Sequence, residues 1–253
     1  MVNKRSLQRL SEGALDLLAP QACCLCGMPS GRSIALCRPC ESSLPRNQAA
    51  CRLCALPLAG ADLVCGLCQR RPPPARISVA PILYTEPVAG LIRNLKYRGD
   101  FSQVAVLSQL MLNTVRRRLV DSRPPDFLLP MPLHWWRQWR RGFNQAELLA
   151  RSLCNQAQLQ PWALTIDKRL CRRQRHTLPQ ASLSARERAQ NLRGALVCRR
   201  QLNGEHIAIV DDVVTTGTSA WSLASVLLAA GAGEVEIWCC ARTPGQSESA
   251  RGE

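Results

Sequence analysis

Apolar residues in the last two thirds of the chain alternate between short runs and longer stretches of helical length. Short apolar runs bounded by turn residues are typical of strands, whereas helices need longer periodic stretches. The predicted elements are, in chain order, a strand at Val79–Tyr84, helices at Pro87–Tyr97 and Phe101–Leu119, a strand at Phe127–Pro130, a helix at Asn144–Gln158, strands at Ala195–Cys198 and Ile207–Val210, a helix at Ser219–Ala230 and a strand at Val235–Cys239. This alternation predicts an α/β fold with a mostly parallel twisted sheet flanked by helices, whose ligands collect beyond the carboxyl ends of the strands.

The first third of the chain has a different composition. It holds few large apolar side chains, and its Cys-rich part is below the size at which a hydrophobic core alone usually suffices. The run Arg70–Pro74, two Arg followed by three Pro, marks the seam between two units. We expect an N-terminal helical segment at 1–19, a small Cys-rich domain at 20–74, an α/β domain at 75–243 and a disordered tail at 244–253. No apolar run approaches the roughly 18 residues of a membrane span, so none is expected.

Cysteine spacing predicts two structural metal sites. The chain has 14 Cys, and eight of them form four C-x2-C pairs, each beginning fourteen residues after the last. Two such knuckles supply the four thiolates of a tetrahedral zinc site, which leaves no open position for water. The predicted ligands of two zinc ions are Cys23, Cys26, Cys37, Cys40, Cys51, Cys54, Cys65 and Cys68. Ten-residue loops within each ribbon favour sequential pairing, first knuckle with second and third with fourth; a cross-brace is the alternative.

A disulfide framework is the alternative reading of these cysteines, and it would require export. The N-terminus does not predict export, because Glu12 and Asp16 interrupt its apolar stretch and Ala14–Ala19 is too short for a signal sequence. We therefore expect a cytoplasmic protein that binds zinc. The cysteines outside the knuckles are expected to be mostly small buried apolar residues.

The segment Ile207–Ser219 predicts a phosphate-binding turn. Four apolar residues lead to Asp211 and Asp212, and a Thr- and Gly-rich turn then enters a helix. Hydroxyl groups and backbone N–H groups at the start of a helix favour an anion. The carboxylates would repel a phosphate, so they are better suited to neutral hydroxyl groups such as those of a ribose. The turn matches neither GxxxxGK[ST] nor GxGxxG, which makes a nucleoside triphosphatase an unlikely reading.

This segment resembles the phosphoribosyl pyrophosphate (PRPP) signature of type I phosphoribosyltransferases. The resemblance implies that Asp211 and Asp212 act as catalytic residues by holding the ribose hydroxyls, and that the following loop wraps the 5-phosphate. The implied PRPP-binding residues are Val213, Val214, Thr215, Thr216, Gly217, Thr218 and Ser219. In purine-salvage members the position of Thr215 is usually Asp, so Thr215 argues against a purine substrate.

A second loop, Pro130–Gln145, follows the carboxyl end of another predicted strand. Its residues Arg137, Arg140 and Arg141 are candidates to bind pyrophosphate, because guanidinium forks match phosphate oxygens. A solvated basic patch is the alternative. With 33 Lys plus Arg against 18 Asp plus Glu, the net charge of +15 makes a polyanion partner plausible.

Tryptophans stand among these arginines, at Trp135, Trp136 and Trp139. Aromatic faces beside guanidinium groups are typical of grooves that bind single-stranded nucleic acid. Tryptophans that anchor the loop into the core are the alternative. Single-stranded DNA is therefore a candidate partner.

The knuckles, Leu95–Tyr97, Arg140–Gln145 and the PRPP signature together resemble the ComF family, including its gluconate-X-type and competence-type members. Thr177–Gly194 resembles it as well, so that the likeness covers nearly the full length. The implied fold is that of a type I phosphoribosyltransferase preceded by a double zinc ribbon. The resemblance also implies a mobile hood at about Cys171–Arg188. In this hood Arg172, Arg173, Arg175 and His176 are candidates to close on pyrophosphate.

The family resemblance implies a protein of DNA uptake or utilisation, as in natural competence, that binds PRPP or ribose 5-phosphate with Mg²⁺. As a phosphoribosyltransferase, a pentosyl-transferring glycosyltransferase, it would let an unidentified acceptor displace pyrophosphate at the anomeric carbon, with Mg²⁺ as Lewis acid. The alternative is a non-catalytic nucleic-acid-binding adaptor that keeps the PRPP fold as scaffold or sensor. Other DNA-uptake proteins are further candidate partners.

Overall fold

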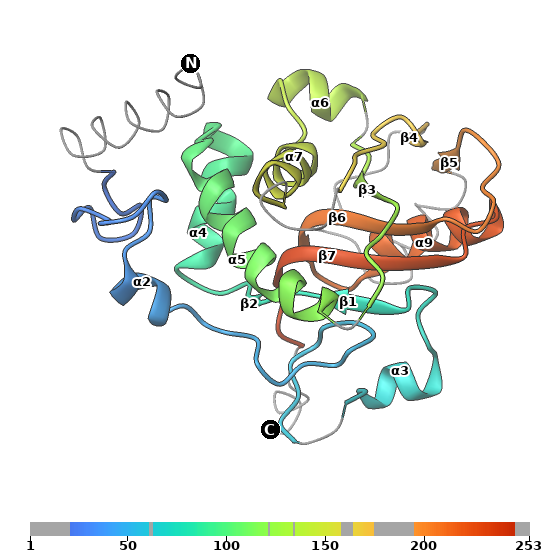
Figure 1. The fold of residues 1–253 in the computed structure, drawn as a ribbon, viewed down its shortest axis with the longest axis horizontal. Helices are drawn as coiled ribbons and strands as arrows, with labels where there is room; N and C mark the ends of the chain where they lie inside the picture. Colours follow the sequence, from blue (N-terminus) through green and yellow to red (C-terminus); the bar gives the residue numbers. More distant parts are fainter. Residues whose placement is uncertain are drawn as a thin grey trace, which may run out of the picture.

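The computed structural model describes residues 21–60, 63–120, 122–133, 135–157, 164–174 and 195–245. Its centre is a five-stranded sheet in which every pairing is parallel. The strand order is β1 (Ile77–Val79), β7 (Glu234–Arg242), β6 (His206–Val214) and β3 (Phe127–Pro130), and β2 (Ile82–Leu83) also pairs with β7 (Figure 1). The predicted α/β class, a parallel sheet flanked by helices behind a Cys-rich domain, is confirmed.

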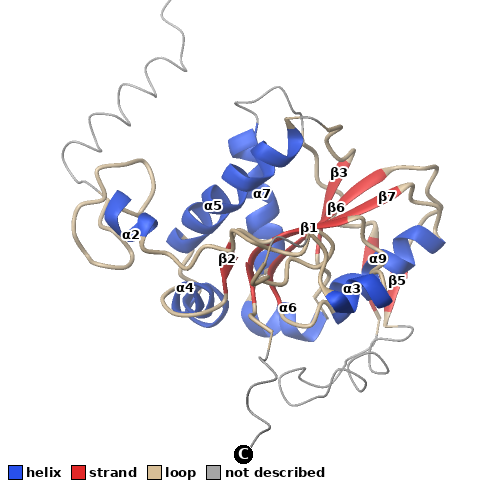
Figure 2. Cartoon of the chain, turned by 90° about the horizontal axis from the view of Figure 1, so that it is seen from below, coloured by secondary structure: helices blue, strands red, loops and turns tan. Residues whose placement is uncertain are grey.

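Helices cover both faces of this sheet. α5 (Ser102–Leu119) and α7 (Gln145–Ala157) lie on one side and α9 (Thr218–Ala229) on the other (Figure 2). The side chains of β6 alternate between these layers: Ala208 and Val210 join the cluster of α5 and α7, whereas Ile207 and Ile209 join that of α9. All four are fully buried. Burial on both faces explains why this strand appears in the sequence as an unbroken apolar run.

The central strand is longer than predicted. β6 continues past Val210 to Val214, because its register with β7 extends through Asp211 opposite Cys239 and Val214 opposite Arg242. Backbone pairing with a neighbour therefore outweighs the low strand propensity of two adjacent Asp residues. The two carboxylates therefore lie within the last residues of strand β6 and not in the loop that follows it.

Two predicted elements are divided. The single strand predicted at Val79–Tyr84 is split into β1 and β2, since Pro81 between them has no N–H to donate to the sheet. The helix predicted at Pro87–Tyr97 is α4 (Val88–Arg93) followed by a π-helical turn, η1 (Asn94–Arg98). Gly99, in a left-handed conformation with φ of 66°, ends this turn.

Two further predictions are corrected. The loop predicted at Pro130–Gln145 contains a helix, α6 (Trp135–Arg141), which the basic and aromatic composition did not suggest. The strand predicted at Ala195–Cys198 is present as β5 (Leu196–Cys198) but lies outside the main sheet, because it pairs antiparallel with β4 (Cys171–Arg173). Much of the segment between β4 and β5, including most of the predicted hood, lies outside the described residues.

The Cys-rich region repeats one local design twice. A knuckle turn closed by a short bridge, Ala22 to Pro29 and then Ala50 to Pro57, precedes a second knuckle at the start of a short helix. These helices are α2 (Arg38–Ser42) and α3 (Gly66–Arg70). We call Cys23–Cys40 the first ribbon and Cys51–Cys68 the second ribbon. In Figure 1 the first ribbon lies beside α4, whereas the second continues below the edge strand β1.

The predicted N-terminal helical segment and nearly all of the predicted tail lie outside the described residues. Among the helices that are described, none combines the length and the apolar character that crossing a bilayer requires.

Candidate active site and metal centres

The predicted phosphate turn lies at the carboxyl end of the sheet, where β6 passes through Thr215–Gly217 into α9. The Thr216 and Thr218 hydroxyl oxygens are 2.8 Å apart. Gly217 has a φ of +82°, and a Cβ atom there would lie 2.6 Å from the ring of Trp221. Glycine is therefore required both by the backbone conformation and by the indole below it. The first N–H groups of a helix have no partner within it, so the turn presents donors to an anion.

Two carboxylates stand directly before this turn. Asp212 is buried, and its Oδ2 lies 2.7 Å from Nζ of Lys96 in η1. The Asp211 side chain is partly exposed and accepts a hydrogen bond from the backbone N–H of Asp212 at 2.9 Å. Lys96 was not among the predicted site residues, although it lies in the Leu95–Tyr97 segment. A lysine so far upstream in the chain has no local signal for its role, because only the fold brings it to the carboxylates.

The charges of this group perturb one another. Burial, followed by the neighbouring charge of Asp212, raises the pKa of Asp211 to about 8, although Lys96 opposes the shift. Burial lowers the pKa of Lys96, but attraction to Asp212 and Asp211 outweighs it, and the pKa is raised. The ammonium of Lys96 therefore stays charged and balances one of the two carboxylates.

Carboxylates, turn and arginines line one cavity of about 890 Å³. All nine predicted residues from Asp211 to Ser219 border it, as do Lys96, Tyr97 and Arg98 of η1 and the arginines Arg140, Arg141 and Arg173. The guanidinium of Arg141 lies 5.3 Å from the centre of the Tyr97 ring and donates to Oε1 of Gln145 at 3.1 Å. These contacts hold one of the candidate pyrophosphate arginines at the wall of the cavity.

Some predicted residues lie outside the described set, and one lines a different cavity. Arg137 lies on α6, but its side chain and that of Trp135 are outside the described set, as are Arg175 and His176. Arg172 lines a second cavity and not the main one. Trp139 is 79% exposed and so does not anchor α6 into the core, which removes that alternative for this tryptophan.

A buried arginine that sequence reasoning missed supports the turn from beneath. Arg242, at the end of β7, is 5% exposed. Its guanidinium donates to the carbonyl oxygens of Val214 at 3.1 Å and Thr215, and its Nε donates to the carbonyl oxygen of Cys54 at 2.9 Å. One side chain therefore ties the turn to the second ribbon. Nothing in the local sequence around Arg242 marks this contact, because both partners are distant along the chain.

The eight knuckle thiols form two groups in sequential order. Cys23, Cys26, Cys37 and Cys40 make one group and Cys51, Cys54, Cys65 and Cys68 the other, with all sulfur atoms of a group within 4.8 Å of one another. The cross-brace alternative is thereby removed. Sγ of Cys26 lies 3.8 Å from that of Cys37, and Sγ of Cys54 lies 3.7 Å from that of Cys65.

Both groups fit zinc. Tetrahedral Zn–S bonds of about 2.3 Å place the sulfurs about 3.8 Å apart, as these thiols are. Burial raises the pKa of the Cys23 thiol, but backbone N–H groups of Cys37 and Cys26 outweigh it and lower the pKa to about 6. Donors aimed at the sulfur thus favour the thiolate that a metal requires. Zinc held by four thiolates in this way would stabilise the fold and leave no site for catalysis.

Comparison with known proteins gives matches to both parts of the chain. A family model described as a double zinc ribbon domain matches residues 14–69. The chain is 37% identical over 231 residues to the DNA utilization protein YhgH of Salmonella typhimurium, covering 90% of this chain and 99% of that protein. It is 37% identical over 230 residues to YhgH of Escherichia coli K12, with the same coverage. It is also 35% identical over 164 residues to competence protein F of Haemophilus influenzae, covering 63% of this chain and 69% of the relative.

Solved structures give a more distant likeness. A hypoxanthine phosphoribosyltransferase from Staphylococcus aureus is 13% identical to this chain, with a TM-score of 0.33. The matched part is 53% of this chain and 62% of the Staphylococcus aureus chain. A purine phosphoribosyltransferase from Pyrococcus horikoshii is 14% identical and covers 55% of this chain and 72% of its own, with a TM-score of 0.28.

Proposed function

Since this chain belongs to the ComF family, with the DNA utilization protein YhgH and competence protein F, we propose that it acts in DNA uptake or utilisation. At its main cavity it binds PRPP or a ribose 5-phosphate compound together with Mg²⁺. Free thiols at all 14 cysteines, eight of them in metal-binding groups, support the reducing cytoplasm as its compartment.

The observation that carries this proposal is the composition of one cavity. Two carboxylates, a hydroxyl-rich turn at a helix start and four arginines border the same space of about 890 Å³. A ribose 5-phosphate with a pyrophosphate at C1 has the matching three parts. The hydroxyls suit Asp211 and Asp212, the 5-phosphate suits the turn, and the pyrophosphate suits Arg140, Arg141 and Arg173.

Lys96 resolves an electrostatic conflict within this arrangement. Two ionised carboxylates beside a phosphate turn would repel the ligand, but Asp212 is paired with Lys96 at 2.7 Å, and the raised pKa of Asp211, about 8, leaves its carboxyl largely protonated in the free protein near neutral pH. Asp211 then accepts from a ribose hydroxyl while Asp212 keeps Lys96 in place. A bound Mg²⁺ would add Lewis-acid help for the departing pyrophosphate. As positive charge develops on the ribose ring, the carboxylates stabilise it electrostatically, and the arginines bind the negative leaving group.

Calorimetric titration with PRPP and Mg²⁺ tests the binding. The wild-type protein is expected to bind one PRPP, and Asp211→Asn/Asp212→Asn to lose at least about tenfold in affinity, which corresponds to 1.4 kcal/mol. The control Glu205→Gln/Glu234→Gln removes the same two charges at the amino ends of β6 and β7, away from the cavity. Absence of heat with the wild type, or equal affinity in all three proteins, would contradict the proposal.

Catalysis is tested separately. Labelled PRPP is incubated with a panel of nucleobases, amines and DNA, and release of pyrophosphate is measured. If the protein is a phosphoribosyltransferase, one acceptor class stimulates release, and loss of a catalytic carboxylate raises the barrier by about 3 kcal/mol. PRPP binding without any stimulated release would favour a sensor or scaffold over an enzyme.

The second candidate, a nucleic-acid-binding adaptor, has its own supporting observation. Trp139 on α6 is 79% exposed, and nearby the guanidinium of Arg140 lies 5.5 Å from the ring centre of Trp136. Such faces stack on the bases of single strands. Affinity for a single-stranded oligonucleotide should then fall steeply with salt and should drop after Trp139→Ala. A flat salt response would remove this candidate.

A further inference from the structure

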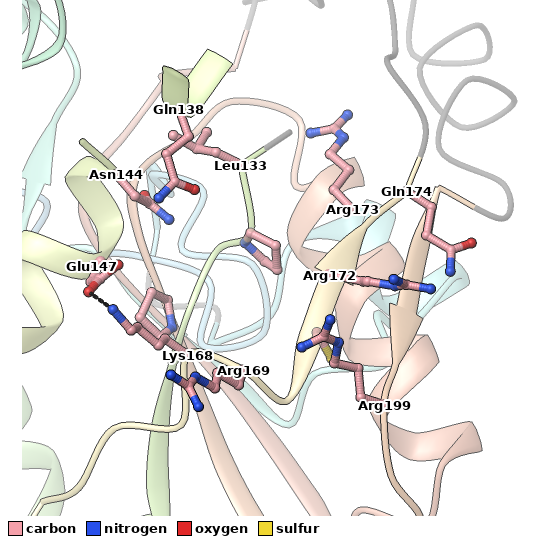
Figure 3. A pocket seen from close by; sticks show the side chains of 13 residues that line it. Leu133, Gln138, Asn144, Glu147, Lys168, Arg169, Arg172, Arg173, Gln174 and Arg199 are labelled. Carbon is pink, nitrogen blue, oxygen red and sulfur yellow. Dashed lines mark hydrogen bonds and ion pairs between the residues drawn. The ribbon is translucent and has the colours of Figure 1, made fainter. Parts of the chain in front are cut away.

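A second cavity of about 640 Å³ opens beside the main one (Figure 3). It lies between the end of β3, the start of α7 and the β4–β5 pair. Pro132, Leu133 and Arg173 border both cavities, so the two spaces share a wall. None of the functions proposed above uses the second cavity.

The lining of this cavity is strongly basic. Five cationic side chains border it, Lys168, Arg169, Arg172, Arg173 and Arg199. Glu147 is the one acidic side chain among the described residues of the lining, and it is paired with Lys168 at 2.8 Å and with Arg151 at 2.8 Å. Burial raises the pKa of Glu147, but hydrogen bonds from Lys168 and Arg151 outweigh it and lower the pKa, so the carboxylate stays ionised and compensated.

Two of the arginines have no acidic partner. Among the described residues, no carboxylate lies within 4.0 Å of the guanidinium of Arg169 or Arg199, whereas the adjacent Arg200 pairs with Asp167 and Glu205. The partner of Arg172 is a neutral amide. When the amide oxygen of Gln174 faces Arg172, it accepts a hydrogen bond from Nη2 of Arg172 at 2.7 Å. The cavity therefore presents uncompensated guanidinium groups, which suit a phosphate with two charges.

These arginines stand on a fixed support. Cys171 pairs with Cys198 across the β4–β5 ladder, and the backbone N–H of Arg199 donates to the carbonyl oxygen of Leu170 at 2.8 Å. Leu170, Cys171 and Leu196 are buried in the same cluster as the side chains of α9. Figure 3 shows Arg172 and Arg199 side by side on this pair of strands, with Arg169 to their left. The ladder fixes the backbone that carries Arg172 and leads into Arg199, while the side chains of both arginines are exposed to an incoming ligand.

We propose that this second cavity binds the phosphate group of a nucleotide acceptor, supplied as a free nucleotide or as the phosphorylated end of a single strand. A volume of about 640 Å³ is larger than a phosphate needs and falls within the range of small-molecule sites. Because the cavities share a wall at Pro132, Leu133 and Arg173, an acceptor anchored here would extend toward the main cavity. This proposal extends the proposed function and rests on it, because the bound nucleotide is an acceptor only if PRPP binds in the main cavity.

Fluorescence anisotropy with a thymidine trinucleotide tests the site. The probe carries a 3′ fluorophore and either a 5′-phosphate or a 5′-hydroxyl group. Wild type is compared with Arg169→Gln/Arg199→Gln and with the control Arg117→Gln/Arg123→Gln. The control removes two exposed arginines from the far end of α5 and the segment after it. Thermal melting of all three proteins checks that they are folded.

The expected result is a 5′-phosphate preference of at least about tenfold in the wild type, since hydrogen bonds to a charged group are stronger than those between neutral groups. Arg169→Gln/Arg199→Gln should lose this preference and the control should retain it. Equal binding of the two probes by the wild type, or a preference that survives in Arg169→Gln/Arg199→Gln, would overturn the proposal. Competition by thymidine 5′-monophosphate at concentrations close to those of the probe identifies a free nucleotide as ligand; competition only by the phosphorylated strand identifies its end.

PRPP titration of the same variants separates this proposal from the first. The affinity for PRPP should stay within about twofold in Arg169→Gln/Arg199→Gln, because neither arginine borders the main cavity. A fall of tenfold or more would mean that the second cavity holds the pyrophosphate of PRPP, and would overturn the acceptor assignment. If the wild type does not bind PRPP but prefers the 5′-phosphate, the proposed function fails while the anion site stands.

Discussion

The two zinc ribbons share one repeat in the sequence but differ in what they touch. In the first ribbon Cys23 and Cys37 are buried against the cluster of α4 and α5, and Cys26 is exposed. In the second ribbon all four cysteines are buried, and Trp221 of α9 packs against them. The same indole lies below Gly217 in the phosphate turn. The two metal sites therefore have the same ligands but different surroundings. Among the described residues, the second ribbon packs against the candidate active site through Trp221 and the first ribbon does not.

Arg242 adds hydrogen bonds to the packing contact between the second ribbon and the phosphate turn. It joins the carbonyl oxygen of Cys54 in the second ribbon to those of Val214 and Thr215 at the turn. No comparable contact between the first ribbon and the turn is present in the part of the chain that the structure describes. We infer that zinc in the second ribbon supports the turn, whereas zinc in the first ribbon stabilises only its own surroundings.

The largest expected effect comes from breaking the metal sites one at a time. Cys26→Ser and Cys54→Ser change equivalent positions of the two ribbons, and each should reduce bound zinc from two ions to about one. Cys54→Ser should weaken PRPP binding by a factor of about 100, roughly 3 kcal/mol, while Cys26→Ser leaves it within about twofold. Metal analysis and calorimetry on the same samples measure both. Equal losses of PRPP affinity in the two variants would contradict the inference that the second ribbon supports the turn and the first does not.

Removing the link itself is expected to have the next largest effect. Arg242→Met leaves the buried carbonyl oxygen of Cys54 without its donor, at a cost of about 1 kcal/mol or more, and removes the guanidinium from Val214 and Thr215, although the Val214 carbonyl still accepts from the N–H of Thr243 at 3.0 Å. Stability to urea and PRPP affinity should both fall. The control Arg76→Met removes an exposed arginine at the amino end of β7, the end opposite to Arg242, whose pair with Glu234 contributes little. If PRPP affinity survives in Arg242→Met, the ribbon does not act through this arginine.

A smaller effect is expected from strain within the turn. Gly217→Ala places a methyl group 2.6 Å from the Trp221 ring at a φ of +82°, and should cost about 1–3 kcal/mol together with about tenfold in PRPP affinity. Gly231→Ala is the matched control, because this glycine at the opposite end of α9 has a φ of +102° and also lacks room for a Cβ atom. It should cost comparable stability but leave PRPP affinity unchanged. A parallel loss of affinity would assign both effects to general destabilisation.

The smallest effect concerns the pH dependence of stability. The pKa of Asp211 is raised to about 8, so that between about pH 4 and pH 8 the unfolded chain loses this proton and the folded protein retains it. Rising pH therefore favours unfolding through Asp211. Asp211→Asn removes that penalty. At pH 8 the free energy of unfolding of the variant should exceed that of the wild type by about 1–2 kcal/mol, and its melting temperature should be higher. At pH 4 the two proteins should melt at the same temperature. A difference in melting temperature that does not change with pH would contradict the raised pKa.

Local sequence patterns accounted well for elements with local causes. The apolar run Ile207–Val210 predicted a strand buried on both faces, and knuckle spacing predicted two four-thiol groups with sequential pairing. The turn of Thr and Gly residues does lie at the start of a helix beside two carboxylates. In each case the residues that interact are close along the chain, or repeat at a fixed spacing.

Features that depend on distant partners were missed. β6 runs on through Asp211 and Asp212 because β7 supplies backbone partners, and Lys96 reaches Asp212 only through the placement of η1. Arg242 lies at the end of a strand whose length was itself underestimated. Long-range pairing decides these positions, and a single sequence carries no local sign of it.

A crystal structure of the protein with PRPP and Mg²⁺ would test the central claim most directly. We predict the 5-phosphate at Thr215–Ser219, the ribose hydroxyls within hydrogen-bond distance of Asp211 and Asp212, and the pyrophosphate toward Arg140, Arg141 and Arg173. PRPP bound in another place, or a crystal soaked at saturating concentration whose main cavity holds only solvent, would contradict the account.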